Sequence, residues 1–156
     1  MKITVNSVQE TFDIGSFIGK NSKSGDIICL IGDLGTGKTH LTKGIAKGLD
    51  IDDHITSPTF NIVNEYDTGR LKLYHFDVYR VCEPDEIEAI GFDEYIFGDG
   101  VSVVEWANYI TELIPNTALT ISIDKDIVDE NKRYITFTYS NKKYDYLKDI
   151  LTQYNN

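Results

Sequence analysis

Apolar residues recur along the chain with two spacings, so segments typical of strands alternate with segments typical of helices. Alternating apolar positions, or a short unbroken apolar run, predict strands at 3–5, 26–31, 60–66, 71–78, 101–105, 117–123 and 133–139. Apolar positions every three or four residues predict helices from residue 7 to about 20 and at 38–48, 83–90, 107–113 and 144–151. Strands that alternate with helices predict an α/β domain in which helices pack on a sheet.

Local signals mark where some of these elements begin and turn. Ser7 and Glu10 have the spacing of a capping box, which predicts the start of the first helix. The polar segment Asp67–Arg70 joins two alternating runs and predicts a β-hairpin. No repeat, low-complexity stretch or proline-rich linker divides the chain, so we expect a single domain over residues 1–156.

The composition excludes several classes of protein. Of the 156 residues, 41% are hydrophobic and 26% are charged, which excludes a disordered tail, a collagen-like chain and a coiled coil. The longest apolar run, Ile27–Ile31, has five residues, whereas a membrane span needs about 20. The first residues lack the apolar block of a signal peptide. Cys29 and Cys82 lie far apart and form no metal-binding pair. We therefore expect a cytoplasmic protein with reduced thiols and no membrane contact.

The net charge of −10 is concentrated in one stretch of the chain. Between Val81 and Asp124 there are ten acidic residues and no Lys or Arg, whereas acids and bases balance elsewhere. Affinity for a nucleic-acid backbone comes mostly from Lys and Arg that neutralise phosphates, so no direct, stable binding of nucleic acid is expected. The acidic stretch is either a solvated surface or a face for a basic protein partner.

A glycine-rich segment after the strand at 26–31 carries the clearest chemistry. Residues 32–39 read Gly-Asp-Leu-Gly-Thr-Gly-Lys-Thr and fit the pattern G-x-x-x-x-G-K-[ST]. The glycines let backbone N–H groups turn toward a phosphate, and the following helix directs its positive end there. In such a loop Lys38 would contact the β- and γ-phosphates, and the Thr39 hydroxyl would bind Mg²⁺. The segment predicts a three-layer P-loop NTPase fold with a mostly parallel central sheet and a β-hairpin insertion.

A Mg-nucleotide site also needs a carboxylate near the metal, and two predicted strands supply one. Glu105 ends the buried strand at 101–105, and Asp77 lies near the end of the strand at 71–78. Glu105 has the cleaner Walker-B form, because a largely apolar strand leads directly into it. The sequence leaves open which of the two acids handles the metal and which handles water.

The segment Asn141–Tyr144 bears on the choice of base. It reads Asn-Lys-Lys-Tyr and nearly matches the guanine-reading pattern N-K-x-D. Tyr144 stands where the discriminating carboxylate is required, and Asp145 comes one position late. The missing carboxylate favours ATP over GTP.

Four motifs occur in the order typical of one protein family. They are the loop at 32–39, Ser57-Pro58-Thr59-Phe60, Tyr74-His75-Phe76-Asp77-Val78-Tyr79-Arg80 and Val104-Glu105-Trp106. With them the chain resembles the TsaE family, the small bacterial ATPases of tRNA threonylcarbamoyladenosine synthesis. The His-Phe-Asp-x-Tyr-Arg block is specific, whereas the phosphate loop alone would not be.

The resemblance implies a P-loop ATPase that works on a two-protein assembly of TsaD and TsaB. TsaD transfers the threonylcarbamoyl group to an adenosine beside the tRNA anticodon. The ATPase binds these partners and uses ATP turnover to sustain their cycling, so its own hydrolysis is expected to be weak alone and partner-dependent. An acidic chain would thus act in tRNA modification without holding tRNA itself.

The resemblance also implies roles for individual residues. Thr39 and Glu105 resemble the Mg²⁺ ligands, and Lys38 resembles the phosphate clamp. Asp77 resembles the family's essential acid, as water orienter or coupling residue. Thr59, in a switch-like loop, has a hydroxyl that could reach metal or water. Thr11, Asn108 and Arg133 match family nucleotide contacts only loosely. The full set of residues expected to contact the nucleotide is Thr11, Gly35, Thr36, Gly37, Lys38, Thr39, His40, Asn108 and Arg133.

Two other functions remain open on the same loop. A small-molecule kinase would need arginines on a lid to neutralise the transferred phosphoryl group, and the chain has only Arg70, Arg80 and Arg133. A nucleotide-gated binding module with negligible hydrolysis would need only the loop. Replacing Glu105 by Gln discriminates the ATPase from the module, because turnover should stop while much nucleotide binding remains.

Overall fold

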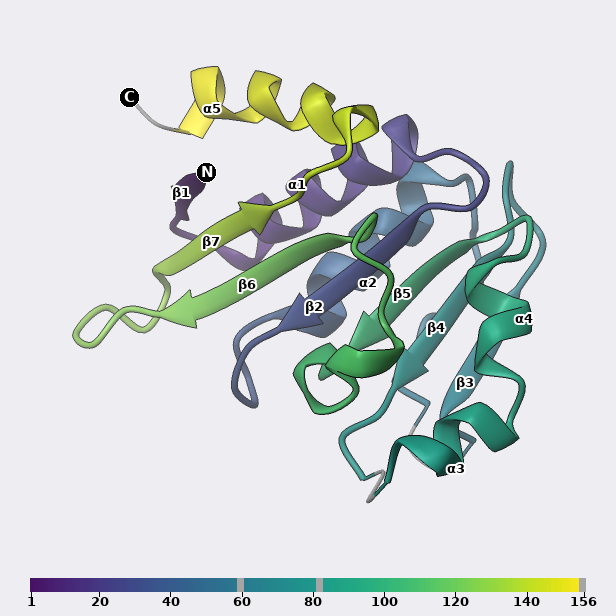
Figure 1. Ribbon diagram of the computed structural model, residues 1–156. Coiled ribbons are helices and arrows are strands. Elements are labelled where there is room, and N and C mark those ends of the chain that lie inside the picture. Colours follow the sequence, from purple (N-terminus) through teal and green to yellow (C-terminus); the bar gives the residue numbers. More distant parts are fainter. Residues whose placement is uncertain (59–60, 81–82, 155–156) are drawn as a thin grey trace.

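One mixed sheet of seven strands, in the order β1-β7-β6-β2-β5-β4-β3, forms the centre of the molecule (Figure 1). The structure is a computed structural model that describes residues 1–58, 61–80 and 83–154. Its strands are β1 Lys2–Val5, β2 Ile27–Ile31, β3 Val63–Tyr66, β4 Leu73–Asp77, β5 Val101–Glu105, β6 Leu119–Lys125 and β7 Arg133–Thr138. All seven predicted strands are therefore present; β5 has the predicted bounds, and the other six have shifted ends.

The expectation of a mostly parallel sheet is correct only for the core. Strands β6, β2, β5 and β4 run parallel, but three of the six pairings along the described sheet, β1–β7, β7–β6 and β4–β3, are antiparallel. Parallel neighbours need a long crossover, whereas a short loop joins β6 to β7 and another joins β3 to β4. The second of these is the predicted hairpin.

Helices cover both faces of the sheet (Figure 1). The longer helices, α1 Val8–Asn21 and α2 Lys38–Gly48, pack together on one face. The opposite face carries α3 Pro84–Ala89, α4 Phe92–Ile96 and the 3-10 turn η1 Ala107–Tyr109. The chain closes with η3 Lys142–Leu147 and α5 Lys148–Tyr154, which packs beside β1. None of the described helices is long and apolar enough to span a bilayer.

The two faces of the central strands bury different side chains. Leu73 on β4 and Val103 on β5 belong to the core under α1 and α2, whereas Phe76 and Val104 belong to the core under α3 and α4. Because successive side chains of a strand point to opposite faces, His75, Asp77 and Glu105 share the face of α1 and α2.

Some local predictions hold and others need correction. The Ser7 hydroxyl caps α1 by accepting a hydrogen bond from the Glu10 N–H at 3.1 Å. The predicted helix at 107–113 consists of two 3-10 turns, η1 and η2 Thr111–Leu113, because Trp106 enters with a left-handed backbone. Helix α4 was not predicted, and Gly91 at φ 85° separates it from α3. Cys29 is a free, buried thiol, and burial raises its pKa to about 12, as is typical of an unreactive thiol. Cys82 lies outside the described residues.

Candidate nucleotide site

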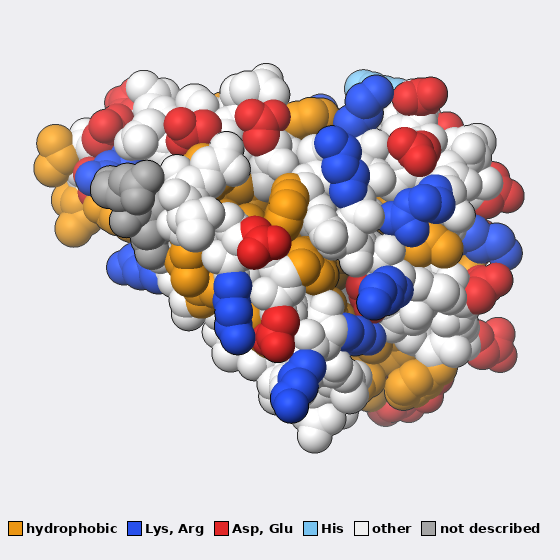
Figure 2. Space-filling model, turned by 90° about the horizontal axis from the view of Figure 1, so that it is seen from above, with side chains coloured by type: hydrophobic (Ala, Val, Ile, Leu, Met, Phe, Trp, Pro, Cys, Tyr) orange, Lys and Arg blue, Asp and Glu red, His pale blue; other side chains and the backbone are white. Residues whose placement is uncertain are grey.

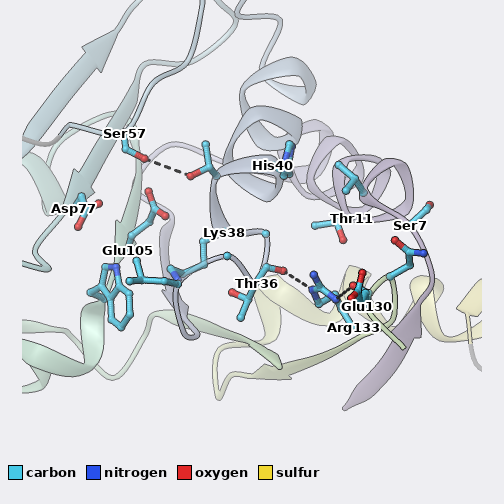
Figure 3. A pocket seen from close by; sticks show the side chains of 17 residues that line it. Ser7, Thr11, Thr36, Lys38, His40, Ser57, Asp77, Glu105, Glu130 and Arg133 are labelled. Carbon is cyan, nitrogen blue, oxygen red and sulfur yellow. Dashed lines mark hydrogen bonds between the residues drawn. The ribbon is translucent and has the colours of Figure 1, made fainter. Parts of the chain in front are cut away.

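A pocket of about 360 Å³ lies at the carboxyl ends of the parallel strands β2, β4 and β5 (Figure 3). Ligands of open α/β sheets bind at this edge, where loops diverge to opposite faces. The pocket is lined from the start of α1, the loop into α2, the ends of β4 and β5, and the approach to β7. Its described lining includes Ser7, Thr11, Gly35, Thr36, Gly37, Lys38, Thr39, His40, Ser57, Asp77, Glu105, Trp106, Glu130, Asn131 and Arg133.

The loop between β2 and α2 has the backbone of an anion-binding turn. Gly35 and Gly37 adopt φ values of 77° and 115°, which residues with a Cβ rarely adopt. Gly37 caps α2 without a side-chain hydrogen bond, so the first N–H groups of the helix are left for a ligand. The buried Thr36 hydroxyl also has no hydrogen-bond partner among the described residues. The loop therefore fits a phosphate group.

Lys38 lies at the centre of the pocket. Its ammonium group donates hydrogen bonds to the carbonyl oxygens of Gly32 at 2.6 Å and Asp33 at 2.9 Å. It also lies 4.3 Å from the ring centroid of Trp106. Burial lowers the pKa of Lys38, while the negative charges of Glu105 and Asp77 oppose that shift. The side chain is thus held across the loop, beside the two acids.

The two candidate acids lie side by side but in unlike surroundings. Asp77 and Glu105 are opposite each other in the parallel register of β4 and β5. Glu105 is buried and accepts a hydrogen bond from the His75 ring at 2.6 Å. Asp77 accepts one from the Tyr79 N–H at 3.0 Å. Burial, with a smaller contribution from the charge of Glu105, raises the pKa of Asp77 above its ordinary value.

The hydroxyl of Thr39 completes this end of the pocket. It lies 3.3 Å from the Ser57 hydroxyl, the pair marked in Figure 3. The Ser57 loop, for which the resemblance implies a switch-like role over the γ-phosphate, therefore reaches the start of α2. Thr59 of the same loop lies outside the described residues. His40 is exposed and lines the pocket on the α2 side.

The opposite end of the pocket contains Ser7, Thr11, Glu130 and Arg133 (Figure 3). The Arg133 guanidinium donates to the Thr36 carbonyl at 3.1 Å, which ties β7 to the loop. Thr11 is buried on α1. Asn108 differs from the other expected contacts, because it is exposed on η1 and is not among the lining residues.

The candidate guanine reader lies away from the pocket. The Tyr144 hydroxyl hydrogen-bonds the backbone of Ile27, at the start of β2, whereas the phosphate loop follows the end of β2. Arg70 is also remote, because it donates to the carbonyls of Gly19 and Ser22 at the end of α1. Among the arginines of the described chain, Arg133 alone lines the pocket.

Sequence reasoning missed several lining residues. Ser7 was predicted only as a helix cap, and Glu130 and Asn131 carried no signal because they lie in the short loop between β6 and β7 and match no motif. The position of Glu130 and Asn131 at the pocket depends on β7 returning beside β6, next to the phosphate loop. A local pattern does not encode that return.

Glu105 differs in exposure from the other acidic residues between Val81 and Asp124. Nine of the ten acids between Val81 and Asp124 are exposed, and Glu105 is buried.

The face in Figure 2 shows acidic and basic side chains interspersed rather than one basic stripe. No group of three His, Cys, Asp or Glu residues that could hold a metal occurs within the described ranges.

Comparisons with known proteins agree with this geometry. A family model described as "Threonylcarbamoyl adenosine biosynthesis protein TsaE" matches residues 5–135. The chain is 45% identical to a Bacillus subtilis protein named tRNA threonylcarbamoyladenosine biosynthesis protein TsaE, over 98% of this chain and 94% of that one. A Treponema pallidum protein of the same name is 39% identical over 85% and 96%.

A solved structure is similar over the whole chain. It is described as the crystal structure of Bacillus subtilis YdiB and matches with a TM-score of 0.79 and 40% sequence identity. The match covers 100% of this chain and 96% of that one. With the family model spanning most of the chain, these likenesses establish that the chain belongs to the TsaE family.

Proposed function

We propose that this protein binds and hydrolyses ATP with Mg²⁺ in tRNA threonylcarbamoyladenosine synthesis, acting on an assembly of TsaD and TsaB. One observation carries the enzymatic part. The loop lysine, the loop threonine and two strand-end carboxylates all line a single pocket on the face of α1 and α2. Membership of the TsaE family supports the role in this pathway. The proposal includes a more specific fold for the α/β domain, the three-layer P-loop NTPase fold.

The oxygen ligands that this site offers suit a magnesium ion that is bound partly by the phosphates of the nucleotide. Thr39 and Glu105 each offer one oxygen ligand, and Mg²⁺ usually takes one or two protein carboxylates, phosphate oxygens and water. When bound, the ion neutralises charge on the phosphate oxygens. A site with too few protein ligands for a dedicated metal cage is therefore compatible with this ion.

The chain's own groups supply the remaining chemistry. The ammonium of Lys38 and the free N–H groups of α2 would hold the phosphates. Asp77 is suited to orienting a water and accepting its proton, because its raised pKa brings it nearer to neutral pH than an ordinary aspartate. Thr11 and Arg133 would contact the nucleotide at the other end of the pocket.

The arrangement of cations supports weak activity alone. Arg133 is the arginine in the described pocket lining, and it lies at the end opposite Asp77 and Glu105 (Figure 3). Charge that develops on a transferred phosphoryl group is strongly stabilised by an arginine, which in many NTPases comes from a partner. A partner that adds a positive group, or orders the Ser57 loop, would raise the rate.

The kinase and the binding module remain the alternatives. The kinase is less well supported, because Arg70 is engaged at α1 and no second arginine lines the described pocket. For the module, Glu105→Gln is decisive. We expect this variant to lose hydrolysis by at least about 100-fold, the usual scale for a group acting in the transition state, while nucleotide affinity stays within several-fold. Unchanged tRNA modification with a hydrolysis-dead variant would favour the module.

The first experiment is Mg-dependent ATP hydrolysis by the pure protein, alone and mixed with TsaD and TsaB. Weak hydrolysis that rises on mixing supports the proposal. Vigorous hydrolysis that ignores the partners would contradict it and redirect the search to phosphoryl acceptors. Glu88→Gln, an exposed acid on α3, is the control and should match the wild-type protein.

A further inference from the structure

The contact between His75 and Glu105 assigns a role to a residue outside the phosphate loop. We propose that His75 is a positioning residue: its imidazole holds the Glu105 carboxylate oriented toward the pocket as the metal ligand, and leaves Asp77 free for water. This rests on the proposed function, because it divides the two acids of that site between two tasks.

The contact is short and fully buried. The His75 side chain is 0% exposed and Glu105 is 2% exposed. The ring Nε2 lies 2.6 Å from Glu105 Oε2. Because a carboxylate accepts, Nε2 donates, and a bond to an ionised acceptor in a buried site is among the strong ones. The carboxylate is therefore held in one orientation.

Within the described part of the chain, the His75 ring has no other hydrogen-bond partner. Its second nitrogen, Nδ1, is buried and meets no hydrogen-bond partner among the described residues. Burying an imidazole costs free energy that an apolar side chain would not, and the neighbour two positions earlier, Leu73, is apolar and fully buried. Packing alone does not account for a histidine here; its one hydrogen bond, to Glu105, does.

The sheet register explains why only one acid is held. His75 and Asp77 point to the same face of β4, opposite Val103 and Glu105 of β5. The histidine reaches diagonally across the strands to Glu105. Asp77 receives only the Tyr79 N–H, so its orientation is not fixed by any described side chain. Ligating carboxylates are commonly fixed by such outer contacts, whose loss costs about 10–100-fold in metal affinity or activity.

The test compares His75→Leu, which removes the donor, with His75→Gln, whose amide N–H replaces Nε2. Binding of a fluorescent N-methylanthraniloyl ATP analogue is titrated with Mg²⁺. We expect His75→Leu to raise the half-saturating Mg²⁺ concentration by about tenfold or more, with little change in metal-free nucleotide affinity, and His75→Gln to restore most of the loss. Val103→Ala, a buried neighbour without polar contacts, is the control for lost packing.

Two further measurements keep the inference falsifiable. In a double-mutant cycle, His75→Leu should add nothing to the Mg²⁺ defect of Glu105→Gln, because both act through one group; additive defects would overturn the role. Without nucleotide, NMR should show a slowly exchanging imidazole N–H proton that shifts in Glu105→Gln and not in Asp77→Asn. Absence of that proton overturns the contact itself. If the nucleotide affinity of the wild-type protein did not change with Mg²⁺ concentration, the proposed function would be overturned instead, together with the metal role of Glu105.

Discussion

Asp77 shows at the scale of one residue how a site works against stability. Burial raises its pKa, the adjacent Glu105 raises it further, and the Tyr79 N–H compensates in part. A raised pKa means that the folded protein binds this proton more tightly than the unfolded chain. The ionised carboxylate therefore destabilises the fold, and that cost appears as pH rises from the ordinary aspartate pKa of about 4 through the raised folded value.

Removing the charge of Asp77 should therefore stabilise the free protein while harming catalysis. We expect Asp77→Asn to raise Tm at pH 7, by roughly 2–4 °C for each 1 kcal/mol gained, and to lose the gain near pH 3, below the ordinary aspartate pKa of about 4, where both states are protonated. ATP hydrolysis should fall in the same variant. Thermal melts at the two pH values are the measurement, and a lower Tm at pH 7 would contradict the stated pKa direction.

At the scale of elements, the packing of α1 against α2 depends on glycines. Gly15 and Gly19 of α1 face Gly44 and Gly48 of α2, where a Cβ on any of the four would come within 2.3 Å of a backbone oxygen of the other helix. This close approach brings the start of α1, with Ser7 and Thr11, to the pocket that the start of α2 helps to form. The helix pair thus positions the site.

A methyl group at this contact should force the helices apart. We expect Gly19→Ala to destabilise the protein by about 1–3 kcal/mol, as overpacking does, although alanine is the better helix former by about 1 kcal/mol. Lys47→Ala, on the exposed side of α2, removes only a surface ion pair with Asp52 and should stay near zero. Urea unfolding measures both, and a neutral Gly19→Ala would show that the helices can separate freely.

At the scale of the whole molecule, the pocket collects segments from most of the chain. Its lining runs from Ser7 near the first strand to Arg133 at the start of β7, and the Arg133 bond to the Thr36 carbonyl joins the two. The unfolded chain cannot hold these segments together. A nucleotide that binds here stabilises the folded state by mass action alone.

Nucleotide should therefore raise Tm by an amount that grows with the logarithm of its concentration relative to Kd. At a concentration 100 times its Kd, Mg-ATP should stabilise the protein by about 2.7 kcal/mol. The same concentration of GTP should give a smaller shift, because the Asn141–Tyr144 segment lies at the other end of β2. Lys38→Ala should abolish the ATP shift, whereas Lys142→Ala, remote from the pocket, should keep it. Equal shifts in the two variants would place nucleotide elsewhere. Differential scanning fluorimetry gives all four values.

How much the sequence predicted depended on how local each feature is. The phosphate loop, the Ser7 cap and the Asp67–Arg70 turn were readable because each is set by a few adjacent residues and their backbone needs. The alternation of strands and helices was readable for the same reason. The prediction that β5 ends at Glu105 was also correct, since a carboxylate after a largely apolar run marks the end of the apolar strand.

The tertiary structure decided what depends on neighbours far apart in the chain. The antiparallel β6–β7 return brought Glu130 and Arg133 to the phosphate loop, and η1 left Asn108 outside the pocket. The pairing of β4 with β5 set His75 against Glu105, whereas Asp77 received a backbone N–H, that of Tyr79. By itself the sequence determined which reactive side chains the chain carries and which local elements hold them, because residue types and short-range periods are local. Which groups act together was decided by strand order and register, because these follow from the burial of all the apolar faces at once.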